Sequence, residues 1–435
     1  MEKRKLGIKE WFFLWSLGVV GQLCWNIENV WFNTFVYKKI SPDPSIITWM
    51  VAVSATATTI ATFLMGALSD RVGKRRPFIG WGYIAWGLFT IAFGLTQYLT
   101  SILENRFAVL VAVVVAADSI MSFFGSTGND ASFSAWTTDL LDEGNRGQIG
   151  AAVAIHPVLG TIVGTILGGV IIESFGYLAF FTTMGAVVIF MGVLSLLFLD
   201  EPKKEKQKDK PFLKQFLSAF NFRDVLRMRE LFLIFLTMAV FLVGFNFFFI
   251  HITNYFIYVL GYSEDLAGII QGGSLLVAVL ATIPAAHFIN KNKSQPLVLA
   301  AFGVYIAGLL VIYFFSDLNL PALILGVVLA GAGYLVQLQT LTVWTKKLYP
   351  DASRGEFEGV RIIFAVLIPM ILGPALASPI IDRYGIPIVV DGKEGVAPTP
   401  LLFLGGIVFA LLALLPLILA DRERKKREGK TLPVE

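Results

Sequence analysis

Residues 128–147 read GNDASFSAWTTDLLDEGNRG, and residues 343–355 read VWTKKLYPDASRG. In both stretches a Trp-Thr pair precedes an Arg-Gly pair at the same spacing, and the two copies are 208 residues apart. After each copy an apolar run ends in a related sequence, IIESFG at 171–176 and IIDRYG at 380–385. Two such matches in register indicate an internal duplication. We therefore expect two related halves, with the function arising between them.

The composition is that of a membrane protein. Of 435 residues, 56% are apolar and 15% are charged, whereas soluble domains carry about 25% charged residues. The mean hydropathy is +0.72. Apolar runs long enough to cross a bilayer core of about 30 Å recur along the chain, and the absence of strand-like alternation predicts helices. We predict twelve membrane spans, at 11–37, 46–68, 78–99, 107–138, 149–172, 178–199, 231–259, 266–289, 296–315, 321–346, 357–381 and 400–420.

These spans predict an all-α membrane protein built from two pseudo-symmetric six-helix bundles. The N-terminal bundle covers 1–199, and the C-terminal bundle covers 231–420. The charged linker 200–230 between them cannot enter the bilayer, and we expect a short amphipathic helix near 211–228. Residues 421–435 form a tail.

The distribution of basic residues predicts the orientation. With both termini inside, 29 of the 35 Lys and Arg residues fall in the cytoplasmic segments, as the positive-inside rule requires. The first apolar run is too long for a signal-peptide core, so we expect it to remain as the first helix. We therefore expect a multi-pass protein of the cell (inner) membrane with cytoplasmic termini.

The titratable residues argue against an enzyme. Three scattered His, a lone intramembrane Cys24 and no nucleotide or hydrolase motif offer little from which to build an active site. We therefore predict no catalytic residues, no cofactor and no metal site. The net charge of +4 reflects the basic loops, and its dispersal between apolar runs is not a nucleic-acid signal.

The first helix carries a polar stripe. Gln22, Asn26, Asn29 and Asn33 share one face at about 100° per residue. Amides facing lipid would be expensive, so this face should look into a cavity; hydrogen bonding between helices is the alternative. Glu28 lies about 120° from the stripe, and an intramembrane carboxylate is a functional candidate by default.

Two acidic residues lie in the fourth helix. Asp118 and Asp130 would be about 18 Å apart along an unbroken helix, which is too far for a direct dyad. Gly125 and Gly128 could kink the helix and change that distance. Asp118 and Asp130 join Glu28 as the candidate proton carriers.

The second half offers amides among aromatic residues. Asn246 and Asn254 lie in a run rich in Phe and Tyr, and Gln271 and Gln337 lie in later helices. Aromatic rings suit the apolar faces of a sugar, and amides suit its hydroxyl groups. The same aromatics equally suit core packing. We expect the sugar-binding residues to be Gln22, Asn26, Asn29, Asn246, Asn254, Gln271 and Gln337.

The loop between the second and third helices carries the most specific motif. Residues 66–77 read GALSDRVGKRRP, which resembles the loop 2–3 signature of the major facilitator superfamily, G-x-L-x-D-R-x-G-[KR]-[KR]. The resemblance implies a latch between two halves, with Asp70 and Arg71 as gating residues. The repeated Arg146 and Arg354 join this set.

Arg361 completes the predicted gating residues. It lies inside the eleventh span and requires a carboxylate partner or a water cavity. Glu356 or Glu358 could be its partner as a helical neighbour, and Asp70 is the alternative across the halves. Snorkelling to the cytoplasm is equally compatible with the pattern.

Within that superfamily, residues 20–150 are similar to the glycoside–pentoside–hexuronide:cation symporters and the sucrose-transporter-like branch. Gly21, Gln22, Trp25 and Glu28 are similar to the G-x-Q-x-x-W/Y-x-x-[QE] pattern of sucrose-type carriers. Residues 69–79, SDRVGKRRPFI, resemble their SDR…GRRRPFI loop. Asp130 falls near the position of a cation-site Asp in melibiose-type carriers.

One departure bears on the coupling ion. Melibiose-type carriers have paired Asp residues in the second helix for sodium, but this helix reads ATATTIAT at 55–62 and has no carboxylate. The departure favours protons as the coupling ion.

We therefore expect a proton-coupled symporter of a di- or oligosaccharide or a glycoside, working by alternating access. The expected partners are a small-molecule substrate, the proton and the lipid bilayer, and we expect a monomer. The alternatives are a proton-driven exporter of amphipathic compounds and a non-transporting membrane sensor on the same fold.

Overall fold

The computed structural model confirms a nearly all-helical membrane fold, whose described residues form two compact units. It describes residues 6–103, 105–142, 144–201, 222–290, 294–317, 319–350 and 354–431. Unit 1 holds the described residues up to 201 together with 262–272 and 387–395, and unit 2 holds the other described residues from 222 onward. Most of the predicted helix at 211–228 lies outside the described residues, which include its end as α9, Phe222–Arg227.

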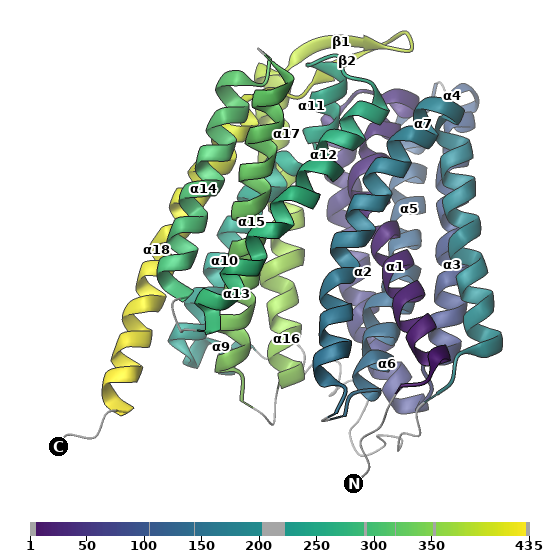
Figure 1. The fold of residues 1–435 in the computed structure, drawn as a ribbon. Coiled ribbons are helices and arrows are strands. Elements are labelled where there is room, and N and C mark those ends of the chain that lie inside the picture. The colour runs from purple at the N-terminus through teal and green to yellow at the C-terminus, as the bar shows by residue number, and fades with distance from the viewer. Residues whose placement is uncertain are drawn as a thin grey trace. The chain divides into compact units, whose positions relative to one another are not determined.

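Unit 1 is a bundle of long helices joined by short turns (Figure 1). Asp43 caps the second helix by accepting a hydrogen bond from the backbone amide of Ser45 at 2.8 Å, and that helix ends at Gly73, whose φ is +70°. The elements in chain order are α1 (Ile8–Phe35), η1 (Val36–Ile40), α2 (Pro44–Val72), α3 (Arg76–Leu95), η2 (Thr96–Tyr98), α4 (Leu99–Ile102), α5 (Phe107–Gly125), η3 (Ser126–Phe133), α6 (Ser134–Asp139) and α7 (Arg146–Phe198).

Helix α7 consists of two helices, because Gly176 has a non-helical backbone with φ +81° and ψ 171°. Its first part packs against α1, and the two run side by side in Figure 1. Gly160 and Gly164 form the contact face: a Cβ on Gly160 would lie 2.6 Å from the backbone of Gln22, and one on Gly164 would lie 2.7 Å from the amide of Asn26. Close approach of these helices therefore needs glycine.

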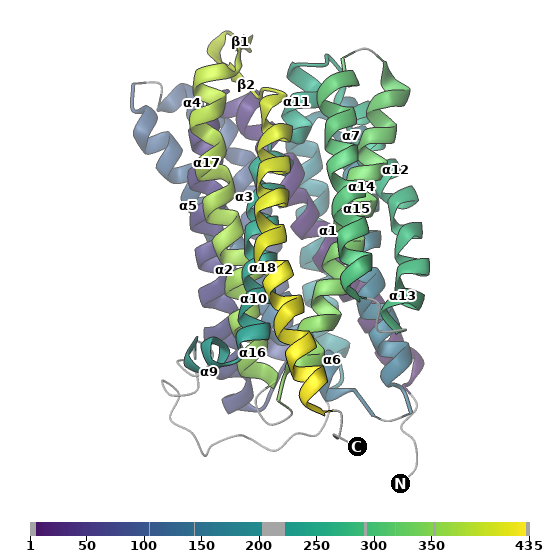
Figure 2. The same ribbon diagram turned by 90° about the vertical axis from the view of Figure 1, so that its left-hand side faces the viewer.

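Unit 2 contains most of the elements of the second half. In Figure 2, α14 lies along α15 and α10 lies along α18. The start of α12 and most of β1 and β2 belong to unit 1. In chain order after α9, the elements of the second half are α10 (Arg229–Phe249), α11 (Ile252–Tyr258), α12 (Glu264–Ala278), η4 (Val279–Ala281), α13 (Thr282–Asn290), α14 (Ser294–Phe315), α15 (Leu320–Leu348), α16 (Arg354–Ile362), η6 (Ile363–Leu367), α17 (Ile368–Tyr384), β1 (Ile386–Val390), β2 (Lys393–Ala397) and α18 (Leu401–Thr431).

The strands β1 and β2 form a hairpin where the sequence predicts a plain external connection. Asp391 and Gly392 both have positive φ, 48° and 79°, as a two-residue hairpin turn requires. The ammonium of Lys393 donates to the backbone oxygens of Lys39 and Ile40 at 3.1 and 2.8 Å. The tip of the hairpin therefore caps the carbonyl end of η1 within unit 1.

Membrane spanning is supported by ten described helices that are long and apolar enough to cross a bilayer. One of the ten is α7, which the break at Gly176 divides in two, and α1 is a further helix of 28 residues. These helices are consistent with the twelve predicted spans.

Candidate functional site

Three carboxyl groups from α1, α5 and η3 form a cluster in the described part of unit 1. Glu28 on α1 and Asp118 on α5 are buried, with 8% and 1% of their surface exposed, and Asp130 on η3 is partly buried. Glu28 interacts electrostatically with both Asp118 and Asp130. Although Asp118 and Asp130 belong to one membrane span, the link between them therefore runs through a different helix.

Glu28 and Asp118 each have an oxygen atom that lacks a hydrogen-bond partner. The hydroxyl of Ser122 lies 2.8 Å from Glu28 Oε1 and 2.8 Å from the backbone oxygen of Asp118. Glu28 Oε2 and Asp118 Oδ1 are buried without a partner in the described part of the chain. Ser54 of α2 lies beside both carboxyl groups. Because two buried anions so poorly paired would be costly, this arrangement suits groups that can hold a proton.

Asp130 differs from this pair because donors surround it. Its Oδ2 accepts from the Ser126 hydroxyl at 2.9 Å. Its Oδ1 accepts from the indole of Trp25 at 3.2 Å and from the Asn129 amide at 3.3 Å. Hydrogen bonds of this kind stabilise a carboxylate, so Asp130 has the surroundings of a charged group.

A π-helix positions Asp130. The α-helix of α5 widens at Ser126 into η3, where the sequence predicts a kink at Gly125 or Gly128. The hydroxyl of Ser126 lies 3.0 Å from the backbone oxygen of Thr58 and 2.6 Å from the Thr62 hydroxyl, both on α2. π-Helical turns inside α-helices are frequent at functional sites, and this one places Asp130 next to Trp25.

In unit 1, three of the four amides predicted to bind substrate have hydrogen-bond partners. Asn26 is buried and its oxygen accepts from the Thr165 hydroxyl at 3.0 Å, which is the helix–helix bonding that the sequence left open. Asn29 donates to the backbone of its own helix at 2.7 Å, and Gln271 does so at 3.3 Å. Gln22 is half-buried and packs against Gly160.

In unit 2, the polar side chains include two that lack partners. Gln337 is fully buried, and neither its amide nitrogen nor its oxygen has a hydrogen-bond partner among the described residues. Neither ring nitrogen of the buried His251 has a hydrogen-bond partner among the described residues. Asn246 donates to its own helix at 2.9 Å and packs against Gly373. Asn254 is fully buried. Gln337 and His251 are therefore the clearest unpartnered polar groups in this unit.

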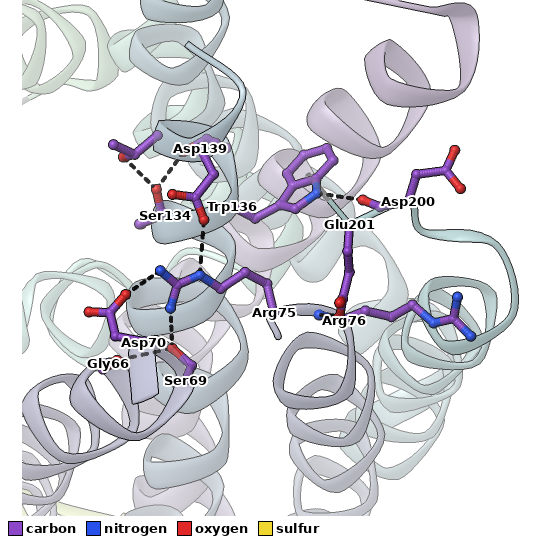
Figure 3. Close-up of polar contacts among 12 residues, drawn as sticks. Gly66, Ser69, Asp70, Arg75, Arg76, Ser134, Trp136, Asp139, Asp200 and Glu201 are labelled. Carbon is purple, nitrogen blue, oxygen red and sulfur yellow. Dashed lines mark hydrogen bonds and ion pairs between the residues drawn. The ribbon is translucent and has the colours of Figure 1, made fainter. Parts of the chain in front are cut away.

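The loop 66–77 folds around a buried arginine that the sequence analysis did not single out (Figure 3). Only 5% of the Arg75 side chain is exposed. Its guanidinium bonds to Asp70 and Ser69, and its Nε donates to Asp139 of α6 at 3.1 Å. Arg71, which the motif suggested as a gating residue, is exposed. One buried cation between two carboxylates therefore ties α2 to the end of α6.

A buried tryptophan completes this end of unit 1. Trp136, the tryptophan of the first repeat, donates its indole hydrogen to the backbone oxygen of Asp200 at 3.0 Å (Figure 3). Glu201 accepts from the backbone amide of Arg76 at 2.9 Å, at the start of α3. The end of α7 is thereby joined to α6 and α3.

Arg361 has the helical-neighbour partner that the sequence allowed. Its Nη2 lies 2.7 Å from Glu358 Oε1, and Tyr349 donates to the other oxygen of Glu358 at 3.1 Å. Arg146 and Arg354 begin α7 and α16, and their side chains lie outside the described part.

A protein-family model matches the sequence across most of its length, in agreement with the fold and the loop motif. The sequence matches the model of the Major Facilitator Superfamily over residues 14–356 and 254–434. The chain belongs to the major facilitator superfamily. It is therefore a multi-pass membrane transporter rather than an enzyme. The sequence matches none of the curated proteins with which it was compared.

Solved structures share the fold of this superfamily member. A bacterial homologue of the human lysosomal transporter Spinster, inward-facing and occupied, has a TM-score of 0.73 at 15% identity, covering 96% of this chain and 98% of that one. The nucleoside transporter NupG has a TM-score of 0.67 at 13% identity, with 96% and 99% covered. A bacterial homologue of the iron transporter ferroportin has a TM-score of 0.64 at 13% identity, covering 95% of this chain and 98% of that one. At these identities the likeness shows the fold alone.

The sequence contained signals for some of the residues that this superfamily member places around its carboxyl groups. Ser122 follows Asp118 by four residues and Ser126 precedes Asp130 by four, a spacing that puts each pair on one helix face. Trp25 belongs to the sucrose-type pattern. Arg75 gave no such signal, because nothing in a run of basic loop residues distinguishes the one that becomes buried.

Proposed function

We propose that this transporter is a proton-coupled symporter of a sugar, either a di- or oligosaccharide or a glycoside. The observation that carries the proposal is the buried pair Glu28 and Asp118, each with an oxygen that has no hydrogen-bond partner among the described residues. Transport would follow alternating access between two related halves.

The proton would be held at this pair. A proton on Glu28 removes one of two negative charges and turns Glu28 into a donor for its neighbours. The single hydroxyl hydrogen of Ser122 serves either Glu28 or the Asp118 backbone at one time, so it can switch when Glu28 gains its proton. Asp130, which accepts from three donors, would remain the charged member of the cluster.

Protons fit this interior better than the sodium of melibiose-type carriers. The stretch 55–62 of α2 contributes hydroxyl groups and no carboxylate. The Thr62 hydroxyl and the backbone oxygen of Thr58 both lie within hydrogen-bond distance of the Ser126 hydroxyl, so α2 positions the residue next to Asp130.

The sugar part of the proposal rests on aromatic rings next to amides in unit 2. Phe245 of α10 and Tyr334 of α15 stack with ring centroids 4.1 Å apart, and both are half-buried. Asn246 follows the first ring, and Gln337 lies one helical turn after the second. A sugar presents C–H faces to rings and hydroxyls to amides, and it would supply hydrogen-bond partners for the buried Gln337, which has none among the described residues.

The remaining predicted residues take their place in this proposal. Gln22, Asn26, Asn29 and Gln271 would contribute polar contacts from unit 1. The ion pairs of Asp70 with Arg75 and of Glu358 with Arg361 would stabilise the ends of the helices.

The test is counterflow in proteoliposomes that contain the full chain. A panel of mono- and disaccharides is measured first, and the responding sugar is then tested with an imposed proton gradient and, separately, an imposed sodium gradient. We expect one sugar class to exchange and to accumulate above its external concentration when protons flow inward. Accumulation that follows sodium instead would overturn the proton assignment.

Exchange of no sugar would sink the sugar assignment. Drug-dependent proton efflux in the same vesicles would then favour the exporter alternative, and ligand binding without flux would favour the sensor.

A further inference from the structure

We propose that Trp25 connects sugar binding to the carboxyl groups of unit 1: a sugar stacks on the face of its indole ring, and its N–H positions Asp130. The inference rests on the proposed sugar–proton symport and adds a residue to it. Trp25 belongs to α1 and precedes Glu28 by three positions. One side chain would thereby touch both the transported molecule and the carboxyl cluster.

Trp25 lies on an accessible stripe in the middle of α1. Of residues 21–37, all of which the structure describes, every one is buried except Gln22, Trp25 and Asn29. At about 100° per residue these three lie within about 60° of one another around the helix. Amide side chains exposed to lipid would be costly, so the stripe faces a polar space rather than the bilayer. Trp25 is the central residue of this stripe.

The Trp25 ring is supported from behind. Its centre lies 4.9 Å from that of Trp86 on α3, with 47° between the two planes, and Trp86 is fully buried. A Cβ on Gly125 of α5 would lie 2.6 Å from the Trp86 ring, so Trp86 is packed tightly against that helix. The accessible part of Trp25 is therefore a platform backed by a fixed ring. The C–H faces of a sugar suit such a platform.

The edge of the same ring contacts Asp130. The N–H of Trp25 donates to Asp130 Oδ1 at 3.2 Å, and the Asn129 amide donates to the same oxygen at 3.3 Å. Both distances are at the long end of the range for N–H···O hydrogen bonds. A small rotation of the Trp25 ring under a bound sugar would therefore break its bond and leave Asp130 with two donors. Sugar occupancy would in this way change the surroundings of the carboxyl cluster.

The other donor to this oxygen is fixed. Asn129 is buried, and a Cβ on Gly21 of α1 would lie 2.4 Å from its Oδ1. The Tyr83 hydroxyl of α3 lies 3.2 Å from that Oδ1 and 2.8 Å from the backbone oxygen of Leu17. Asn129 is therefore held between α1 and α3. Of the two donors to Asp130 Oδ1, Trp25 is the one that a ligand can reach.

Several titratable groups face this site. Asp130 interacts electrostatically with Glu28 of α1 and Tyr83 of α3. Glu28 in turn interacts with Asp118 of α5 and with Cys24. Helix α2 faces the cluster with hydroxyl groups. A thiol and a phenol ordinarily titrate above about pH 8, so of these groups the three carboxyls would respond to a more acidic pH.

Helix α7 contributes a histidine to the same bundle. His156 packs against Gly18 of α1, and its ring centre lies 5.2 Å from that of Trp15 and 6.2 Å from that of Phe133. Gly18 is about 10.5 Å before Trp25 along the helix. Because an imidazole ordinarily titrates near pH 6.5, the test must separate His156 from the carboxyl groups.

The first test measures sugar affinity by counterflow at about pH 5.5 and 7.5, with the sugar that responds in the panel described above. Because sugar and proton binding are reciprocally linked in a symporter, we expect binding to be at least about fivefold tighter at the lower pH. Trp25→Phe keeps a ring but has no N–H, so exchange should continue while this ratio falls below about twofold. Trp25→Ala also removes the platform and should weaken binding about tenfold at both pH values.

Two control variants leave the contact between Trp25 and Asp130 in place. Trp15→Phe changes another half-buried tryptophan of α1, and His156→Gln removes the imidazole that packs against it. Both should keep the affinity ratio of the unmodified protein. Full pH dependence in Trp25→Phe would overturn the inference, as would an equally large loss of pH dependence in either control.

The second test needs no variant that has to fold. The full chain carries fluorotryptophan at position 25 alone, and its fluorine NMR signal is recorded in detergent. We expect the signal to move when the exchanged sugar is added and, separately, between the two pH values. A signal that does not respond to a sugar that the protein exchanges would overturn the inference while leaving the symport proposal intact.

The fluorine signal also separates failure of the inference from failure of the proposed function. If no sugar exchanges, the sugar assignment fails, and the response to pH alone judges Trp25. A signal that moves between the two pH values would support Trp25 as a positioning residue of the carboxyl cluster. A signal that stays fixed would overturn that role as well.

Discussion

The interiors of the two units differ in charge. Unit 1 encloses Glu28, Asp118 and Asp130 among its helices, two of them buried. In the described part of unit 2 the buried acidic residues are Glu230 and Asp421, and both have ion-pair partners near helix ends. The polar groups deeper in unit 2 are neutral amides, hydroxyls and imidazole. The two units are both helical, but the chemistry of their interiors differs.

The two repeated tryptophans make similar contacts in the two units. Trp136 and Trp344 occupy equivalent places in the two sequence repeats, and both are buried. Trp136 donates to a backbone oxygen at the end of α7. Trp344 donates to the carboxylate of Glu230 and lies under the guanidinium of Arg424. In both units the indole joins helix ends, but in unit 2 its partners are charged.

The largest expected effect concerns the buried arginine of unit 1. Arg75→Ala removes the buried cation that bonds to both Asp70 and Asp139, and breaking a buried pair of this kind costs about 3–5 kcal/mol. We expect a strong loss of thermal stability and of monodisperse protein, measured by fluorescence-detected unfolding in detergent. Arg71→Ala removes the exposed neighbouring charge and should stay within about 0.5 kcal/mol. Similar losses in both variants would show that the motif acts through overall loop charge.

The second prediction tests whether the carboxyl groups of unit 1 perform the coupling. Glu28→Gln keeps the size and hydrogen-bonding capacity of the side chain but cannot exchange a proton. We expect accumulation driven by a proton gradient to be lost, because an intramembrane carboxylate is the group that would carry the proton, while sugar counterflow continues. Asp317→Asn, which neutralises an exposed carboxylate of unit 2, is the control. Full gradient-driven accumulation in Glu28→Gln would exclude this residue as the coupling group.

The third prediction compares the two tryptophans directly. Trp344→Phe removes a hydrogen bond to a carboxylate, worth about 1.5–3 kcal/mol, whereas Trp136→Phe removes one to a backbone oxygen, worth about 0.5–1.5 kcal/mol. Thermal unfolding should therefore show the larger destabilisation in Trp344→Phe. Equal shifts in melting temperature would mean that the charge of Glu230 does not strengthen its hydrogen bond with Trp344.

The smallest expected effect concerns the neutral interior of unit 2. Gln337→Leu puts an apolar side chain of similar size in place of a buried amide that has no partner in the described part of the chain, which should stabilise the protein by about 1 kcal/mol. Sugar affinity, measured by counterflow, should fall in the same variant. Gln339→Leu, two residues away on another face of α15, should leave the affinity unchanged. Loss of stability together with unchanged affinity would remove Gln337 from the proposed binding site.

Local sequence patterns were sufficient for much of this molecule. Apolar runs of bilayer length predicted the helices, and the repeated Trp-Thr and Arg-Gly pairs predicted two halves. Glu28, Asp118 and Asp130 stood out as candidates because a carboxylate is rare in an apolar segment. These features depend on a residue and its near neighbours, which a sequence shows directly.

Other features were decided by contacts between segments far apart in the chain. Glu28 meets Ser122 across 94 positions, and Trp344 meets Glu230 across 114. Burial of Arg75 follows from the position of Asp139 on another helix. The π-helix at Ser126 and the hairpin turn at Asp391 likewise depend on the segments packed against them. Hydrophobic periodicity determines which segments become helices, but side-chain volume, glycine contacts and charge pairing determine which faces meet, and those depend on tertiary packing.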